Sequence, residues 1–308
     1  MTGPSRRQLF LAGTSLVLLA GCGEPHDVIP TPDREDPVEP PPPIGDRIAL
    51  LEQRHNAIVG FYGVDLESNR MFAHRDDDRF AMCSTFKAYL AARVLQKAQH
   101  NELALTDTVH IDPAAVVGYS PVAGPKAGSG VALSELCRAA LQQSDNTAAN
   151  ALLRTIGGPR AITEFARSIG DEQTRLDRWE TDLNSAIPGD PRDTSTPHAL
   201  GGGIRVLLTG SVLDEHYRKQ LEEWMRGNVT SSRSMRAGLP QGWTTADKTG
   251  TGDYASTNDV GIAYGPAGRR VLLSIMTRTR STDPKAEALQ PLIAAVTTLV
   301  LPWLLWRH

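Results

Sequence analysis

Cysteine is scarce in this 308-residue chain, which contains only Cys22, Cys83 and Cys137. Three cysteines are too few for a disulfide framework, and their spacing matches no zinc motif. The eight histidines show no metal-ligand spacing either. A chain of this length can bury a sizeable core without such crosslinks. We therefore expect a globular protein that binds no metal and needs no cofactor.

Net charge is also small, at −3, and it is unevenly distributed. Residues 22–46 contain seven acidic side chains and one arginine, whereas residues 1–21 contain two arginines and no acid. The remainder of the chain, residues 47–308, is therefore nearly neutral. Binding to nucleic acid requires a dense basic face, so the sequence predicts no nucleic-acid partner.

The N-terminal segment lacks a hydrophobic run long enough to cross a membrane. The apolar stretch Leu9–Ala20 follows Arg6 and Arg7, and it has the length of a signal-peptide core. Residues 1–21 resemble a twin-arginine export signal. The sequence Leu-Ala-Gly-Cys that ends at Cys22 resembles a bacterial lipobox, in which the cysteine receives lipid. The alternative is an ordinary signal peptide and a secreted protein.

Residues 22–46 predict an extended tether. Eight prolines lie between residues 23 and 45, with acidic side chains among them. Such a segment cannot bury enough apolar surface to fold, and it favours the polyproline conformation. The sequence thus predicts an exported protein of the cell envelope. Lipid alone would anchor it at the outer face of the cytoplasmic membrane.

A second apolar stretch, Leu289–Trp306, closes the chain, and its 18 residues are long enough to suggest a membrane span. Pro291 and Pro302 interrupt this stretch. We interpret it as a buried helix packed on a sheet.

Strand patterns occur at both ends of the chain and helical patterns lie between them. The strand patterns are Ile58–Leu66, Arg70–His74, Thr244–Lys248, Asp259–Tyr264 and Arg269–Thr277. The helical patterns are Phe86–Gln99, Leu133–Gln143, Thr147–Ile156, Arg160–Ile169, His198–Leu208 and Asp214–Arg226. This order predicts an α/β fold with an antiparallel sheet formed by both chain ends. The α/β domain would comprise residues 47–76 and 227–308, with an all-α domain, residues 77–226, inserted between them.

Ser84 and Lys87 open the first long helical pattern. On a helix, residues three apart share one face, so the hydroxyl and the amine can approach each other. A serine becomes a nucleophile when a neighbouring base removes its proton, and burial lowers the pKa of a lysine. The pattern is short, and its alternative reading is a serine helix cap with a solvated lysine.

Two further motifs favour catalysis. Ser144-Asp145-Asn146 lies between two helical patterns, and Lys248-Thr249-Gly250 ends a strand. The order and spacing of the three motifs resemble those of the penicillin-recognising serine enzymes. The glycine would allow close backbone approach at the sheet edge.

A fourth element lies in a loop rich in proline, glycine and aspartate, at about residues 175–193. Its run from Arg178 through Glu180 to Asn184, followed by Asp193, resembles the Ω-loop of class A serine β-lactamases. By these four elements the chain is identified as a member of that family. The resemblance covers about residues 47–308, and it implies a five-stranded antiparallel sheet flanked by helices.

The resemblance implies a role for each of these residues. Ser84 would be acylated, Lys87 would activate it, and Ser144 would pass a proton to the β-lactam nitrogen. Glu180 would activate the hydrolytic water with help from Asn184. The residues implied to bind substrate are Asn146, Lys248, Thr249, Gly250, Thr251 and Tyr119. Arg178 and Asp193 would form the ion pair that fixes the loop. Whether Lys87 or Glu180 is the base for acylation stays open.

The sequence departs from the family at several positions. Thr181 replaces the proline common after the loop glutamate. The three positions at which relatives carry an arginine for the substrate carboxylate hold Ser234, Thr257 and Ala288. Arg233, Arg278 or Arg280 could supply that charge, although surface solvation explains each of them better. Cys83 and Cys137 lack their family partners, because Gly252 and Ala91 stand there, so both thiols are expected to be free.

Two other functions share the three motifs. A D-Ala-D-Ala carboxypeptidase or transpeptidase would keep its acyl-enzyme for long times, and a penicillin-binding sensor lipoprotein would capture its ligand without turnover. The first class lacks an Ω-loop glutamate, and a sensor has no use for an activated water, so Glu180 and Asn184 favour β-lactam hydrolysis. We therefore expect a monomeric enzyme that acts on small β-lactam molecules and touches the membrane only through its lipid.

Overall fold

The computed structural model describes residues 43–306 of the chain. The expected signal peptide and Cys22 lie outside the described residues. Helix α1 (Ile44–Arg54) begins inside the segment expected to be a tether, so the prediction was wrong for residues 44–46. Ile44, Ile48 and Leu51 recur at helical spacing and pack in one hydrophobic cluster with the C-terminal helix, which explains the early helix start.

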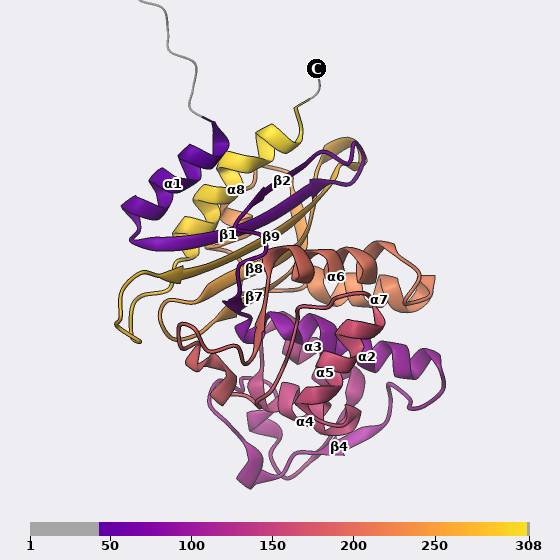
Figure 1. Cartoon of the computed structure of the whole chain (residues 1–308). Coiled ribbons are helices and arrows are strands. Elements are labelled where there is room, and N and C mark those ends of the chain that lie inside the picture. The colour runs from indigo at the N-terminus through magenta and orange to yellow at the C-terminus, as the bar shows by residue number, and fades with distance from the viewer. Residues whose placement is uncertain (1–42, 307–308) are drawn as a thin grey trace, which may run out of the picture. The chain divides into compact units, whose positions relative to one another are not determined.

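The centre of the fold is an antiparallel sheet of five strands in the order β2-β1-β9-β8-β7 (Figure 1). Its strands are β1 (Ala57–Asp65), β2 (Met71–His74), β7 (Thr244–Thr251), β8 (Thr257–Tyr264) and β9 (Arg270–Thr279). Residues Ala57–Asp65 pair in register with Val271–Thr279, so the two ends of the chain meet in the middle of the sheet. The predicted sheet is confirmed.

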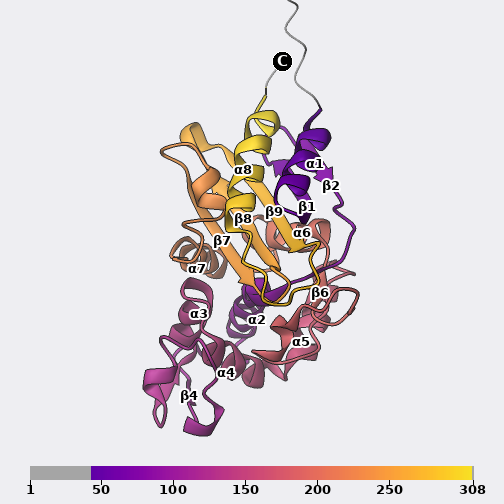
Figure 2. The same ribbon diagram turned by 90° about the vertical axis from the view of Figure 1, so that its left-hand side faces the viewer.

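Helices cover both faces of this sheet. Helix α1 and helix α8 (Gln290–Leu304) lie side by side on one face, where Ile293, Val296 and Val300 are fully buried (Figure 2). The C-terminal apolar stretch is therefore a core helix, as predicted. No helix among residues 43–306 is long and apolar enough to cross a membrane. Helix α6 (Pro197–Thr209) packs on the other face.

The inserted region is mainly helical. Its other helices are α2 (Lys87–Gln99), α3 (Leu133–Gln142), α4 (Asn146–Ile156), α5 (Pro159–Ser168) and α7 (Glu215–Arg226). All six predicted helices of the insertion are present, with ends within about two residues of the predicted ones. Helix α2 lies at the centre of this region, and it contacts α3, α4, α5, α6 and α7. The residues that precede α2, Cys83–Phe86, therefore also lie in the interior.

Short elements complete the described residues. They are strands β3 (Phe80–Ala81), β4 (Thr108–His110), β5 (Gly130–Ala132) and β6 (Thr194–Ser195), and 3-10 turns Cys83–Phe86, Pro113–Ala115, Gly124–Lys126, Asp182–Ser185, Met235–Gly238 and Pro266–Gly268. The Gly-Pro-Ala-Gly run at residues 265–268 predicted the last of these turns. The sequence patterns did not predict the others, because two to four residues carry no measurable periodicity. The β3–β6 pair joins the segment before Ser84 to the end of the Ω-loop.

Candidate active site

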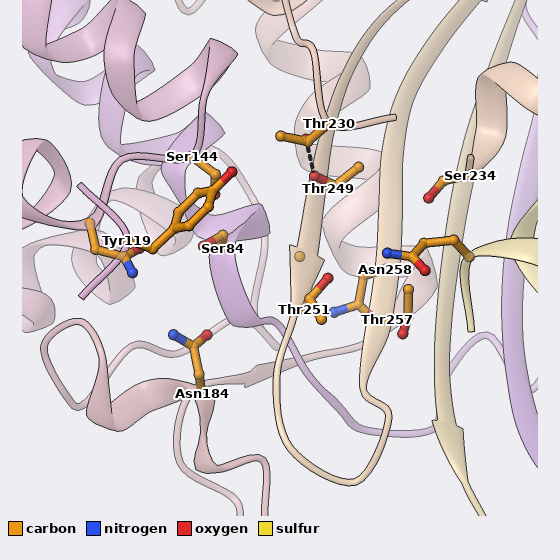
Figure 3. A pocket seen from close by; sticks show the side chains of 13 residues that line it. Ser84, Tyr119, Ser144, Asn184, Thr230, Ser234, Thr249, Thr251, Thr257 and Asn258 are labelled. Carbon is orange, nitrogen blue, oxygen red and sulfur yellow. Dashed lines mark hydrogen bonds between the residues drawn. The ribbon is translucent and has the colours of Figure 1, made fainter. Parts of the chain in front are cut away.

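A cleft of about 350 Å³ opens between strand β7 and the helical region (Figure 3). Thirteen residues line it: Ser84, Tyr119, Ser144, Asn146, Asn184, Thr230, Ser234, Thr249, Gly250, Thr251, Thr257, Asn258 and Gln290. They come from the turn before α2, the α3–α4 junction, the Ω-loop, the sheet edge and the start of α8. The fold thus brings the three motifs and the Ω-loop to one place.

Ser84 lies at the floor of this cleft, in the 3-10 turn that leads into α2. Its Oγ accepts a hydrogen bond of 2.8 Å from Lys87 Nζ and donates one of 3.1 Å to Glu180 Oε1. Lys87 Nζ also lies 2.8 Å from the same carboxylate oxygen. A nucleophile candidate is therefore in direct contact with two groups that can accept its proton.

Lys87 is fully buried. Its Nζ donates to the backbone oxygen of Ser144 at 2.9 Å and to Asn146 Oδ1 at 2.6 Å. Burial lowers the pKa of Lys87, while the Glu180 carboxylate acts in the opposite direction. Because burial disfavours the ammonium form, this amine is a better base than an exposed lysine.

Glu180 is 4% exposed, and neighbouring amides hold it in place. Asn184 Nδ2 donates a hydrogen bond of 2.6 Å to Glu180 Oε2. Asn150 binds the glutamate backbone twice: its Oδ1 accepts from the Glu180 N–H at 3.0 Å, and its Nδ2 donates to the Glu180 carbonyl at 2.8 Å. The Glu180–Thr181 peptide bond is cis. The carboxylate is thus fixed through both its side chain and its backbone.

Asn150 lies outside the four sequence motifs. A signal was present, since this asparagine interrupts the apolar face of α4, where Ala149, Leu152 and Leu153 are buried. A buried amide requires hydrogen-bond partners, so this position indicated a contact between Asn150 and a residue outside its own helix.

Arg178 and Asp193 join the two ends of the Ω-loop. Arg178 Nε lies 2.6 Å from Asp193 Oδ2. The other carboxylate oxygen accepts the N–H groups of Asp177 at 2.7 Å and Arg178 at 2.9 Å. The Asp193 carboxylate is fully buried, and both of its oxygens have partners. The ion pair that joins the loop ends therefore leaves no buried charge unpaired.

The second motif shapes the wall opposite the sheet. Asp145 Oδ1 caps helix α4 by accepting the Ala148 N–H at 2.8 Å, and Asp145 Oδ2 accepts the Val122 and Ala123 N–H groups. These bonds fix the loop that carries Tyr119, which is 64% exposed at the edge of the cleft (Figure 3). Asn146 Nδ2 donates to the Gly118 carbonyl at 2.9 Å.

The third motif lies on strand β7. Lys248 is fully buried, and its Nζ donates to Ser144 Oγ at 3.1 Å and to the Thr249 carbonyl at 2.8 Å. Burial and the nearby Lys87 amine lower the pKa of Lys248 to about 7. A side chain on Gly250 would place its Cβ 2.6 Å from the Met82 carbonyl and 3.2 Å from the Ser84 N–H. Glycine therefore lets β7 approach the nucleophile candidate.

None of the three candidate arginines lines the cleft. Arg280 donates to the Ala57 carbonyl and pairs with Glu52, and Arg278 lines a separate cavity beneath the Ω-loop. Arg233 is exposed. Cys83 and Cys137 are both buried and unpaired, as predicted.

The beta-lactamase enzyme family model matches residues 43–302. The chain is 39% identical to beta-lactamase FAR-1 of Nocardia farcinica, covering 96% of this chain and 95% of that protein. It is 42% identical to a beta-lactamase of Streptomyces fradiae, covering 96% of each. Its fold superposes on the crystal structure of a beta-lactamase from Desulfarculus baarsii with a TM-score of 0.83 and 43% identity, over 86% of this chain and 98% of that one.

A reconstructed class A beta-lactamase of the last common ancestor of Gram-negative bacteria gives a TM-score of 0.81 at 44% identity, over 84% of this chain and 98% of that one. The fold and the cleft are those of a penicillin-recognising serine hydrolase. The chain belongs to the beta-lactamase enzyme family, and within it to class A.

Proposed function

We propose that this protein hydrolyses β-lactam antibiotics through a covalent acyl-enzyme on Ser84 and thereby confers resistance to them. The observation that carries the proposal is the three-way contact of Ser84 Oγ, Lys87 Nζ and Glu180 Oε1, whose separations are 2.8, 2.8 and 3.1 Å. A serine in contact with two bases has what both halves of an acyl-transfer reaction require.

In the first half, Ser84 Oγ attacks the carbonyl carbon of the β-lactam ring and its proton passes to Lys87 or Glu180. The C–N bond of the ring breaks, and Ser144 Oγ gives a proton to the departing nitrogen. Ser144 receives hydrogen bonds from both buried lysines, which supports this role as a proton carrier. The N–H groups of Ser84 and Thr251 would bind the developing oxyanion.

In the second half, Glu180 takes a proton from a water molecule whose oxygen attacks the ester carbonyl. The ester bond to Ser84 Oγ breaks, and the proton returns to that oxygen. The side-chain amide of Asn184 holds the carboxylate and would also hold the water. This step separates the proposal from a carboxypeptidase, which lacks the Ω-loop glutamate and deacylates slowly, and from a sensor, which keeps its ligand bound.

Substrate recognition would use the rest of the cleft. Asn146 Nδ2 carries two hydrogens, and Gly118 takes one of them, so the other can bind the acylamide oxygen of a substrate. Tyr119 forms an aromatic wall. Lys248, Thr249 and Thr251 would bind the ring carboxylate.

Export and lipid attachment at Cys22 belong to the same proposal and rest on residues 1–46. A monomeric state is also part of the proposal. We expect radiolabelled palmitate to be incorporated into the full chain expressed in a bacterial host. Cys22→Ser should abolish the label and release activity from the membrane fraction. Label on the Cys22→Ser chain would contradict lipidation at this residue.

A nitrocefin assay on the mature chain, residues 22–308 with Cys22→Ser, tests the catalytic proposal. A β-lactamase turns over many equivalents of the substrate per mole of protein. A single stoichiometric burst, with the acyl group retained on Ser84, would contradict hydrolysis and favour a sensor or a carboxypeptidase.

A further inference from the structure

The half of the cleft beyond Lys248 has a wall without cationic side chains. Ser234, Thr257 and Asn258 line it (Figure 3). Gln290 lines it as well, and all four side chains are neutral. A substrate with a ring carboxylate would place its charge near this wall if Lys248 and Thr249 bind that group. The wall must then recognise an anion with neutral groups.

Ser234 is the first of these groups. Its side chain is 1% exposed, and its hydroxyl has no hydrogen-bond partner among residues 43–306. Figure 3 shows the hydroxyl pointing toward the cleft. A hydroxyl that faces the cleft and has no partner in the protein can donate its hydrogen bond to a ligand bound there.

Gln290 is the second group, and it is the first residue of the fifteen-residue helix α8. The N-terminus of such a helix carries a partial positive charge. The Leu289 N–H donates to Thr257 Oγ1 at 2.9 Å, which fixes the helix start to strand β8. The Gln290 side-chain amide lines the cleft and has no hydrogen-bond partner among the described residues.

We propose that Gln290, together with Ser234, binds the substrate carboxylate in place of an arginine, and that Gln290 determines how strongly the enzyme depends on that negative charge. This inference rests on the proposed function. An amide donates and accepts hydrogen bonds, whereas a guanidinium only donates. The wall should therefore accept a free acid or its neutral ester, with a smaller preference for the acid than an arginine would impose.

Gln290→Glu is the decisive variant, because a carboxylate at the first position of a helix favours folding but repels an anionic ligand. We expect its melting temperature to be equal to or higher than that of the wild type. KM for a cephalosporin free acid should rise about tenfold, because the glutamate loses the hydrogen bond that the amide donates to the substrate carboxylate and repels that carboxylate. KM for the methyl ester of the same cephalosporin should change less than about twofold.

Gln241→Glu is the matched control, since Gln241 is exposed in the loop before β7, at the strand end away from the cleft. It should leave both KM values unchanged. Gln290→Lys is a second variant and should lower KM for the acid alone, which keeps the test decisive if Gln290→Glu is unstable. An equal change for acid and ester in both variants, or no change in either, would overturn the inference. Absence of turnover in the wild-type chain would instead overturn the proposed function.

Discussion

Lys248 Nζ donates a hydrogen bond of 3.1 Å to Ser144 Oγ, and the side chains of both residues are buried. Lys87 Nζ reaches the same hydroxyl at 3.4 Å from the other side. Two amines in one buried site oppose each other's protonation, which contributes to the lowered pKa of Lys248. The ionisation of Lys248 is therefore linked to the chemistry at Ser144.

The pH dependence of activity should show this ionisation. With a pKa of about 7 in the free enzyme, Lys248 is an ammonium below that pH and becomes neutral above it. The attraction for a carboxylate is present in the protonated form and lost as pH rises. We expect kcat/KM for a cephalosporin free acid to fall above about pH 7, by up to about tenfold per unit. The methyl ester should show a smaller fall, because it lacks the negative charge that the ammonium attracts. A ratio of acid to ester kcat/KM that stays constant to about pH 9 would contradict the lowered pKa.

Removal of the Glu180 base should stop the reaction halfway. Glu180→Gln keeps the size of the side chain but cannot take a proton from water. Deacylation should slow by about 10²-fold or more, while acylation continues if Lys87 serves as its base. Mass spectrometry after exposure to penicillin should show a persistent adduct on Ser84.

Asp182→Asn supplies the control for this variant, because Asp182 is an exposed carboxyl group on the same loop. It should hydrolyse penicillin at the wild-type rate and show no adduct. If Glu180→Gln also turned over at that rate, the assignment of the base would be wrong.

Asn150 should matter for the Ω-loop although it does not line the cleft. Asn150→Ala removes two hydrogen bonds to the Glu180 backbone and leaves a buried N–H and a buried carbonyl unpaired. We expect the free energy of unfolding to fall by about 2–4 kcal/mol. Deacylation should slow more than acylation in stopped-flow measurements, since Glu180 loses its support.

Asn150→Asp separates the two contacts. Its carboxylate can still accept the Glu180 N–H but cannot donate to the Glu180 carbonyl. An intermediate effect on stability and deacylation is expected. Equal slowing of acylation and deacylation in both variants would indicate a general loss of structure instead of a role at Glu180.

Introducing a cation at Ser234 should strengthen binding of the substrate acid. Ser234→Arg places a guanidinium at the cleft wall, and KM for penicillins should fall by about tenfold, the effect of one charge-assisted hydrogen bond. Arg233→Ala should leave KM unchanged because Arg233 is exposed. The opposite pattern, with KM unchanged in Ser234→Arg and raised in Arg233→Ala, would show that Arg233 already supplies the charge.

The sequence predicted those features that repeat or that form motifs. Apolar residues at helical spacing located every helix of the insertion, and the three motifs with the Ω-loop run located Ser84, Lys87, Ser144, Glu180 and Lys248. The fold joins these residues in one hydrogen-bonded group, and their individual roles are proposals. The fold prediction came from periodicity and motif order, and the five-stranded sheet together with the class A structural relatives confirms it.

Other features could not be predicted because they depend on contacts between distant segments. Asn150 acts on Glu180 from a helix thirty residues earlier in the chain. Gln290 lines the cleft only because α8 begins beside β8. The helix at residues 44–46 forms because Ile48 finds a core supplied by the other end of the chain. No local pattern contains such information.

The pairing of β1 with β9 has a consequence for folding while the chain is being synthesised. Arg280 Nε donates to the Ala57 carbonyl across 223 residues of chain, and the whole β1–β9 register depends on similarly distant partners. Contacts so far apart in sequence form late, because loop closure must precede them. Strand β1 is synthesised among the first folded residues, yet one of its edges stays without a partner until residues 271–279 have left the ribosome. During that interval an apolar strand with an open edge is exposed to other chains, so aggregation is the main hazard while the protein is made. A chain truncated before β9 retains that hazard permanently.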